Sequence, residues 1–171
     1  RAGNKVSWVE VSSKQPERSS STTAFNRGEG AYFSDGHVYF TTTGDDRVWA
    51  LNTTTDAIEI IYDAAELGDE APLKDPDCLT VHHTSGDIYV GEDADDLQLV
   101  LLADGAGERV VAPFVQLVGH GNGETGSPGQ DPDTVPASSW KPESEITGLA
   151  FSPDGTRLYM TSQRGLDGVH G

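Results

Sequence analysis

The sequence YFSDGHVYFTT at residues 32–42 returns in altered form as VHHTSGDIYVG at 81–91 and as AFSPDGTRLYMTS at 150–162. Each stretch has an apolar run, then a turn containing Ser, Asp and Gly, then a second run with a tyrosine at its centre. Short β-branched and aromatic runs around such a turn are typical of a β-hairpin. Because one small β unit occurs three times, the sequence favours a β-propeller over a β-sandwich.

Each hairpin lies within a longer set of predicted strands. The first set comprises Ala31–Phe33, His37–Thr42, Arg47–Leu51 and Ile58–Tyr62. The second comprises Leu79–His83, Asp87–Gly91, Leu97–Leu102 and Arg109–Pro113, and a third begins with Gly148–Phe151 and Arg157–Thr161. Four strands joined by short turns match one propeller blade. We therefore expect an all-β fold with about two and a half four-stranded blades.

Residues 1–171 are thus predicted to form part of one propeller domain. A propeller has at least about four blades, so we expect the remaining blades to come from another chain or from a missing segment. Val6–Val11 alternates between apolar and polar residues and predicts a further strand. Ala64–Pro76 predicts a loop between the first two sets. Residues 117–143 are rich in Gly, Pro and Ser, which predicts an insertion that is either a functional lid or disordered.

The composition excludes some classes of partner. With 28 acidic and 11 basic residues, the chain has a formal net charge of −17, which repels nucleic acid and anionic membranes. No apolar run approaches the roughly 18 residues of a membrane span. The single cysteine, Cys78, excludes an internal disulfide and any Cys-based zinc site made by this chain alone. The acidic residues have two interpretations, a solubilising surface or ligands for a hard cation such as calcium.

The positions of certain carboxylates favour the second interpretation. In a propeller, residues just before the first strand of each blade meet at one mouth of the central channel. Glu29, Asp77 and Glu145 occupy that position in the three sets, and Glu92 and Asp93 end the second strand of the second set. Oxygen ligands at equivalent places are what a shared calcium site requires. The alternative is that acidic residues are simply common in turns.

Three motifs resemble one known family. Phe25-Asn26-Arg27-Gly28-Glu29-Gly30, followed by GHVYFTTTGDDRVWAL, resembles the Phe-x-Arg-x-Glu-Gly motif and following blade of the PhoX-type alkaline phosphatases. DPDCLTV and the hairpin that ends in Gly91-Glu92-Asp93 resemble the family's second conserved region. Ser144-Glu145-Ile146-Thr147-Gly148, followed by FSPDGTRLYMTSQ, resembles its third. The motifs occur in the family's order between residues 25 and 163.

The resemblance implies a fold and an activity. The fold is a six-bladed propeller, and the activity is hydrolysis of phosphate esters by a metallophosphatase that uses calcium and iron. The implied metal ligands are Glu29, Glu92, Asp93 and Glu145. Arg27 is either a phosphate-neutralising residue or an ordinary surface arginine. The resemblance also implies a periplasmic or extracellular location.

The chain departs from the family's pattern in its second motif. The family usually has Asn after the aspartate, where this chain has Cys78, a poor calcium ligand. We therefore do not expect Asp77 and Cys78 to bind metal as the corresponding residues of the family do. The family's iron-binding cysteine belongs to a region upstream of these motifs, so Cys78 does not take that role. His82 and His83 lie within a predicted strand and are expected to serve packing and the surface.

Two other functions remain open. Glu29-Gly30 and GLAFSPDGTRLYMT at 148–161 also resemble the calcium-dependent lactonases of the gluconolactonase type, again six-bladed propellers. That family usually has an Asp after its last hairpin, where this chain has Thr161-Ser162-Gln163. The third possibility is a non-catalytic propeller subunit that serves as a scaffold, with any metal purely structural.

Overall fold

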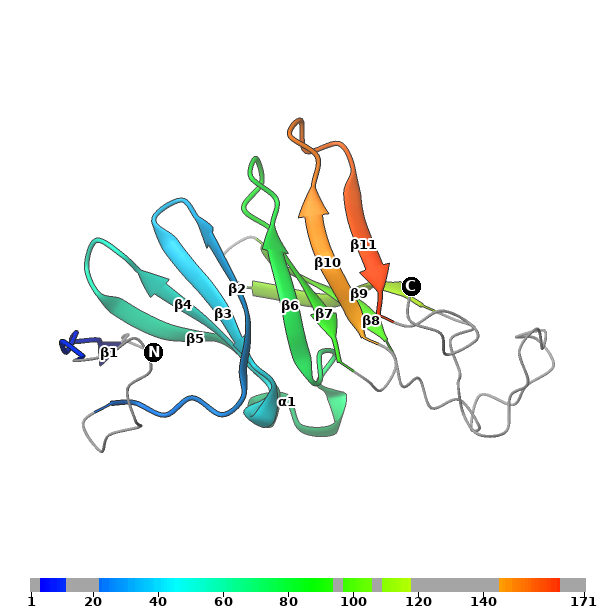
Figure 1. Cartoon of the computed structure of the whole chain (residues 1–171). Coiled ribbons are helices and arrows are strands. Elements are labelled where there is room, and N and C mark those ends of the chain that lie inside the picture. The colour runs from blue at the N-terminus through cyan, green and yellow to red at the C-terminus, as the bar shows by residue number, and fades with distance from the viewer. Residues whose placement is uncertain (1–3, 12–21, 94–96, 106–108, 118–144, 164–171) are drawn as a thin grey trace.

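A computed structural model describes residues 4–11, 22–93, 97–105, 109–117 and 145–163. These residues form three antiparallel sheets of five, four and two strands, which we call the first, second and third sheets (Figure 1). The predicted all-β class is confirmed. None of the three sheets closes on itself within the described ranges.

The first sheet has the strand order β1-β5-β4-β3-β2. Its strands are β1 (Asn4–Lys5), β2 (Gly28–Ser34), β3 (His37–Thr42), β4 (Arg47–Asn52) and β5 (Ala57–Asp63). The β2–β3 turn places Asp35 and Gly36 at φ angles of 44° and 74°. Positive φ at both central residues is typical of a tight hairpin turn, which Asp-Gly adopts readily.

The strand predicted at Val6–Val11 is wrong. Only Asn4 and Lys5 pair with β5, opposite Ile58 and Ala57. Ala57 is the first residue of β5, so the antiparallel chain runs past the end of its partner after Lys5. Alternation of side chains does not make a strand where no ladder partner is present.

The second and third sheets follow the predicted hairpins. The second sheet consists, in order, of β6 (Pro76–Val81), β7 (Ile88–Glu92), β8 (Gln98–Asp104) and β9 (Arg109–Gln116). The third consists of β10 (Ile146–Phe151) and β11 (Leu158–Ser162). All ten strands predicted in the three sets are present, with ends shifted by a few residues. The predicted insertion at 117–143 lies outside the described residues except for Leu117, whose amide donates to the Leu97 carbonyl.

The segment between the first two sheets is not entirely a loop. It contains a short helix, α1 (Ala64–Leu67), and a 3-10 turn at Gly68–Glu70. The Asp63 side chain accepts a hydrogen bond from the Ala65 amide at 3.1 Å and so caps the helix. Ala, Glu and Leu are good helix formers, and Asp is a preferred N-cap, so the helix follows from local preferences.

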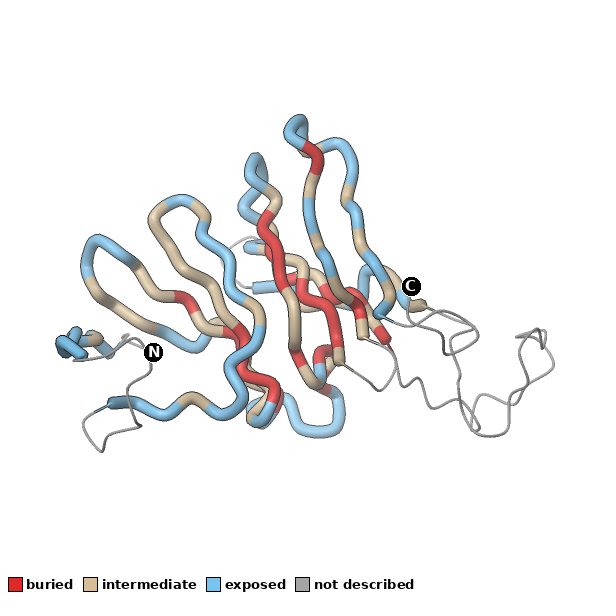
Figure 2. The backbone as a smooth tube through the Cα atoms, viewed as in Figure 1, coloured by how far each residue is buried: buried red, intermediate tan, exposed pale blue. Residues whose placement is uncertain are grey.

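The second sheet lies between the other two, as Figures 1 and 2 show. Val48 and Tyr62 of the first sheet pack in one buried cluster with Leu79, Val90 and Val100 of the second. The Tyr62 hydroxyl is buried, donates to the Leu73 carbonyl at 2.6 Å and accepts from the Leu73 amide at 3.1 Å.

A second core cluster joins the second and third sheets. Leu97, Leu99 and Ile146 are fully buried there, and Tyr89 and Met160 pack against them. The first strands of the three hairpins, β2, β6 and β10, contact one another in series, and we call them the inner strands. None of the helices in the described part of the chain is long and apolar enough to span a membrane.

Candidate carboxylate site

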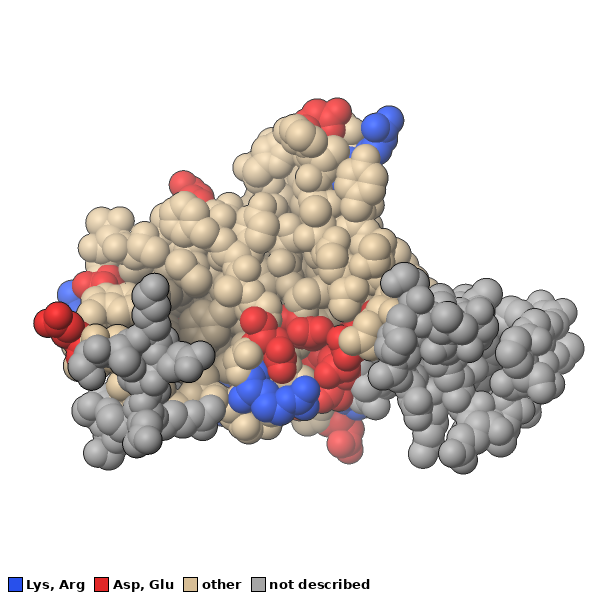
Figure 3. Space-filling model, viewed as in Figure 1, with Lys and Arg blue, Asp and Glu red and all other residues tan. Residues whose placement is uncertain are grey.

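Four carboxylates come together where the inner strands begin. Glu29 lies in β2, Asp77 in β6, Asp93 directly after β7, and Glu145 directly before β10. Figure 3 shows acidic side chains gathered at one edge of the molecule with basic side chains beside them. The sequence placed Glu29, Asp93 and Glu145 at such a site, and the structure brings these three together around Asp77.

Backbone hydrogen bonds fix the positions of the site residues. Asp93 and Glu145 form an isolated antiparallel bridge, and the Asp93 amide donates to the Asp75 carbonyl at 2.9 Å. The Gln163 amide donates to the Glu145 carbonyl at 2.9 Å. The Thr41 hydroxyl donates to the Asp77 carbonyl at 2.6 Å and so ties the first sheet to β6. Elements of all three sheets therefore hold the cluster.

Two glycines allow the inner strands to approach closely. A Cβ on Gly30 would clash with the Asp77 carbonyl and would lie 2.9 Å from the Cα of Cys78. A Cβ on Gly91 would lie 2.9 Å from Ile146 and 3.0 Å from the Cys78 Sγ. Because Gly30 follows Glu29, its close approach to β6 sets Glu29 beside Asp77. Glycine is the residue that permits such backbone contact.

Burial and repulsion between carboxylates together determine the electrostatics of the site. Burial, and then the negative charges of Glu145, Glu29 and Asp93, raise the pKa of Asp77 from 3.8 to about 6. The Arg27 guanidinium lowers it in part. One Arg27 nitrogen lies 3.3 Å from the Asp93 carboxylate and 3.8 Å from that of Glu29. The Arg27 side chain is 55% exposed, so this pairing is only partly shielded from solvent.

The structure does not bring the Glu92 side chain into the cluster. Glu92 is 3% exposed. Its two oxygens accept hydrogen bonds from the Lys74 amide at 2.9 Å and the Gln98 amide at 2.8 Å. Successive side chains of a strand point to opposite faces, so Glu92 and Asp93 diverge. A ligand role for Glu92 would require its carboxylate to leave both amides.

Asp77 is the site residue that sequence reasoning undervalued. Its position before the inner strand matches that of Glu29 and Glu145, and this signal was visible in the sequence. The departure at the following residue, Cys78, argued against it. The Cys78 thiol instead donates to the Ile146 carbonyl at 2.8 Å. Burial, with a smaller effect of Asp77, raises the pKa of Cys78 to about 12, so the group stays a thiol rather than a thiolate ligand.

The two histidines directly follow β6, at the end opposite to Asp77. The His82 ring packs against Phe151, with centroids 4.8 Å apart. One His82 nitrogen lies 3.1 Å from the Gly155 carbonyl and the other 2.7 Å from the Ser85 hydroxyl. His83 is exposed. The expectation that these residues serve packing and the surface is confirmed.

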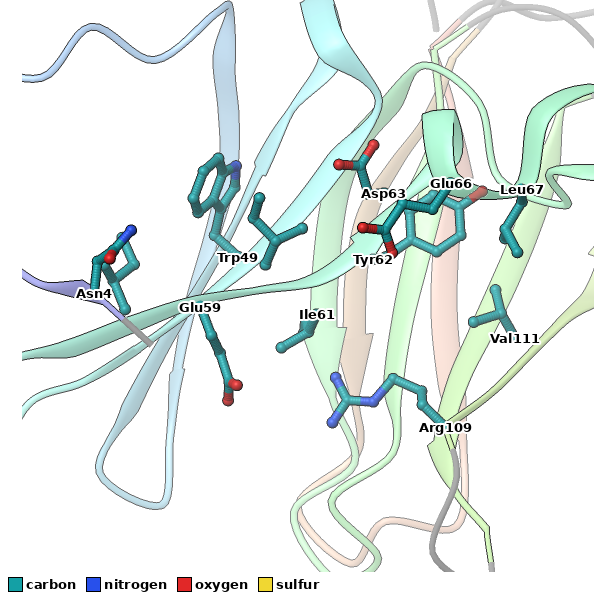
Figure 4. A pocket seen from close by; sticks show the side chains of 12 residues that line it. Asn4, Trp49, Glu59, Ile61, Tyr62, Asp63, Glu66, Leu67, Arg109 and Val111 are labelled. Carbon is teal, nitrogen blue, oxygen red and sulfur yellow. The ribbon is translucent and has the colours of Figure 1, made fainter. Parts of the chain in front are cut away.

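A separate cleft of about 500 Å³ lies on the outer rim between β5 and β9, beside α1 (Figure 4). Trp49, Ile61 and Tyr62 line it together with Arg109 and Val111 of β9. The Arg109 guanidinium pairs with the Asp104 carboxylate at 2.9 Å. The carboxylate cluster does not contribute to this lining, and sequence reasoning did not predict the cleft.

The cluster has the ligand atoms that a hard cation binds, but its side chains are not arranged to coordinate one. Its donors are all carboxylate oxygens, the ligands that calcium prefers. Among the residues that the structure describes, however, no group of three or more His, Cys, Asp or Glu side chains is placed to hold a metal ion. Calcium would therefore require these side chains to turn toward one another. Comparison of the sequence with known protein families and with curated proteins finds no match.

Proposed function

We propose that this chain is part of a calcium-dependent phosphatase of the PhoX type that hydrolyses phosphate esters. In this proposal the three sheets are consecutive blades of a six-bladed propeller, and the remaining blades come from another chain or segment. The observation that carries the proposal is the convergence of four carboxylates from three sheets at Asp77, whose pKa is raised to about 6 first by burial and then by the charges of the other three. The three ordered motifs of the sequence support it independently.

Repulsion within the cluster supports a cation site. Carboxylates that lose solvent contact near one another are unfavourable unless a positive charge compensates them. Arg27 supplies part of that charge through Asp93 and Glu29. A calcium ion accepts six to eight oxygen ligands, so it can accommodate Glu29, Asp77, Asp93 and Glu145 together. We propose these four as the ligands that this chain contributes.

The stacking of the sheets supports the propeller. Each inner strand, β2, β6 and β10, contacts the next one, and each cluster residue lies at an end of an inner strand or its neighbour. In the proposed propeller, equivalent ends of successive sheets would meet around one axis. Location outside the cytoplasm, in the periplasm or the extracellular space, is part of the same proposal.

The metals and Arg27 would have different roles in phosphate-ester hydrolysis. Calcium, with iron as a second metal, would clamp the phosphate and activate an oxygen nucleophile. Arg27 is more than half exposed and lies beside the carboxylates, so its guanidinium can donate to a phosphate oxygen of the substrate. The carboxylates orient this guanidinium toward the site.

Calcium binding is tested by thermal unfolding of the purified chain in chelator and in millimolar calcium. At a hundredfold excess over Kd, a ligand of the native state adds about 2.7 kcal/mol to the free energy of unfolding. We expect a higher melting temperature in calcium, a smaller rise for Asp93→Asn and an unchanged rise for the exposed control Glu59→Gln. Equal melting curves in chelator and calcium would contradict the site.

The reaction is tested on the protein with all its blades and metals present. A phosphate ester and a sugar lactone are assayed in parallel, and calcium and iron are measured by elemental analysis. We expect turnover of the phosphate ester alone, and its loss together with metal in Glu145→Gln. Turnover of the lactone alone would favour the lactonase. Turnover of neither substrate would favour the scaffold.

A further inference from the structure

The Arg27 guanidinium lies between carboxylates of two sheets. One of its nitrogens lies 3.3 Å from the Asp93 carboxylate, which directly follows β7 of the second sheet. The same nitrogen lies 3.8 Å from the Glu29 carboxylate in β2 of the first sheet. A single positively charged group is therefore within ion-pair distance of two carboxylates from different sheets. That is the position that a bridging cation would take.

The charge of Arg27 also acts on the most buried part of the cluster. Burial raises the pKa of Asp77 most, and the charges of Glu145, Glu29 and Asp93 raise it further. The Arg27 guanidinium lowers it, as a positive charge near a carboxylate does. Arg27 therefore offsets part of the repulsion in the whole cluster, and not only at the two carboxylates with which it pairs.

Hydrogen bonds hold the backbone around Arg27 in an unusual conformation. Arg27 has a φ angle of 54°, in the left-handed region that residues other than glycine seldom adopt. Its carbonyl accepts a hydrogen bond from the Thr43 amide at 3.0 Å, and the Asn26 carbonyl accepts one from the Gly44 amide at 3.1 Å. The Asn26 side chain donates to the Gly44 carbonyl at 2.6 Å. These bonds tie the segment to the turn between β3 and β4 and fix the direction in which the Arg27 side chain leaves the backbone.

The position of Arg27 accounts for the arrangement of the carboxylates. Within the described ranges, no three of them are placed around one metal position. A calcium ion needs its oxygen ligands about 2.3–2.6 Å away, which is closer than the guanidinium nitrogen lies to either Glu29 or Asp93. A calcium ion and the guanidinium cannot lie between the same two carboxylates at the same time.

We infer that Arg27 is the counter-ion of this cluster in the metal-free protein, and that calcium binds by displacing its guanidinium from Glu29 and Asp93. Calcium and Arg27 then compete for the same carboxylates, so the ion pair weakens calcium binding. The inference rests on the proposed cation site and adds that the chain itself limits the calcium affinity of that site. Displacement also leaves the guanidinium free for the phosphate contact proposed above.

Calcium titration of the purified chain by isothermal calorimetry tests this inference. We expect Arg27→Gln to bind calcium about fivefold or more tightly than the parent chain, because loss of a competing ion pair shifts the equilibrium by about that factor. Arg109→Gln is the matched control, since it removes the same charge from an ion pair with Asp104 on the outer rim. Its calcium affinity should stay within about twofold of the parent value, because solvent and salt screen a distant charge.

Asn26→Ala separates displacement from a general effect of charge. This variant removes the side-chain hydrogen bond to the Gly44 carbonyl and keeps every charge of the chain. Arg27 is then held less firmly beside the carboxylates, so calcium affinity should rise by about twofold or more, the factor that one hydrogen bond contributes. Urea denaturation in chelator checks that each variant is folded before the titration.

The outcomes distinguish this inference from the proposed function. Calcium binding by the parent chain that is equal to, or tighter than, that of Arg27→Gln would overturn the inference and leave the cation site standing. An equal rise in affinity for Arg27→Gln and Arg109→Gln would show a general charge effect and would also overturn it. Unchanged affinity in Asn26→Ala would overturn the role given to its hydrogen bond. If neither the parent chain nor Arg27→Gln binds calcium, the cation site fails and the inference fails with it.

Discussion

Replacing Asp77 by Asn should stabilise the metal-free protein at neutral pH. In the folded protein the pKa of Asp77 is raised from 3.8 to about 6, first by burial and then by Glu145, Glu29 and Asp93. A raised pKa means that the folded state binds this proton more tightly than the unfolded state does. The free energy of unfolding therefore falls as the pH rises from about 4 to about 6. The neutral Asn side chain removes this loss.

The size of the effect follows from the two pKa values. The difference between 3.8 and about 6 corresponds to an upper bound of about 3 kcal/mol at pH 7. Asp77 is only partly buried, and solvent screens its repulsion from the other carboxylates. We therefore expect Asp77→Asn to raise the free energy of unfolding by about 1 to 2 kcal/mol at pH 7 and by nearly nothing at pH 4.

Urea denaturation in chelator, at several pH values between 4 and 8, measures this difference. Glu59→Gln, at an exposed position of β5, is the control and should follow the parent chain within about 0.5 kcal/mol. Millimolar calcium should reverse the order at pH 7, since a bound cation stabilises the parent carboxylate. Parallel curves for parent and variant across the whole pH range would refute the raised pKa of Asp77 from which this prediction follows.

Three further substitutions, measured by urea denaturation, test packing and hydrogen-bond contacts around the site. Gly30→Ala should cost about 1 to 3 kcal/mol, because the new Cβ meets the Asp77 carbonyl; Gly28→Ala, with open space around its Cβ position, should cost far less. Glu92→Gln should cost about 1 to 3 kcal/mol, since an amide nitrogen cannot accept from a backbone N–H. Tyr62→Phe should cost a similar amount by leaving both polar groups of Leu73 without the hydroxyl. Near-parent stability of the Gly30, Glu92 or Tyr62 variant would show that its contact is dispensable.

The hairpins could be predicted because their determinants are local. Asp35-Gly36 and the alternating runs beside it fix both the turn and the register, and the structure follows them. The short helix at Ala64–Leu67 was missed although its signals are equally local, an Asp cap and good helix formers. Gly68 and Pro72 nearby gave the whole segment the composition of a loop.

The strand predicted at Val6–Val11 is absent for a different reason. Its alternation is a property of six residues, whereas a strand also needs a partner in register. Lys5 pairs with Ala57, the first residue of β5, so β5 offers no partner to Val6 and the residues after it. One hydrogen bond, from the Val6 amide to the Asp56 carbonyl, extends beyond that pair. Register between segments more than 50 residues apart is a tertiary property that the local pattern does not contain.

Three of the four predicted ligands lie near Asp77 because of strand order, and the side chain of the fourth points elsewhere because of strand parity. Glu29, Asp93 and Glu145 lie at equivalent ends of neighbouring sheets, which the repeat predicted. Glu92 shares a face with Val90, and Val90 belongs to the core between the first and second sheets. That parity was available in the sequence and predicts a buried Glu92 that points away from Asp93.

The carboxylate cluster and the tight inner strands are parts of one arrangement. Gly30 allows β2 to approach β6. The hydroxyl of Thr41 in β3 accepts a hydrogen bond from the Gly30 amide and donates one to the Asp77 carbonyl, and so ties the strands together. The same approach places Glu29 beside Asp77, which is unfavourable for the charged forms. A fold gains packing from this contact but loses electrostatic stability at neutral pH. A cation removes that loss while leaving the packing in place, and so the metal-free protein should be the less stable and the more pH-sensitive form.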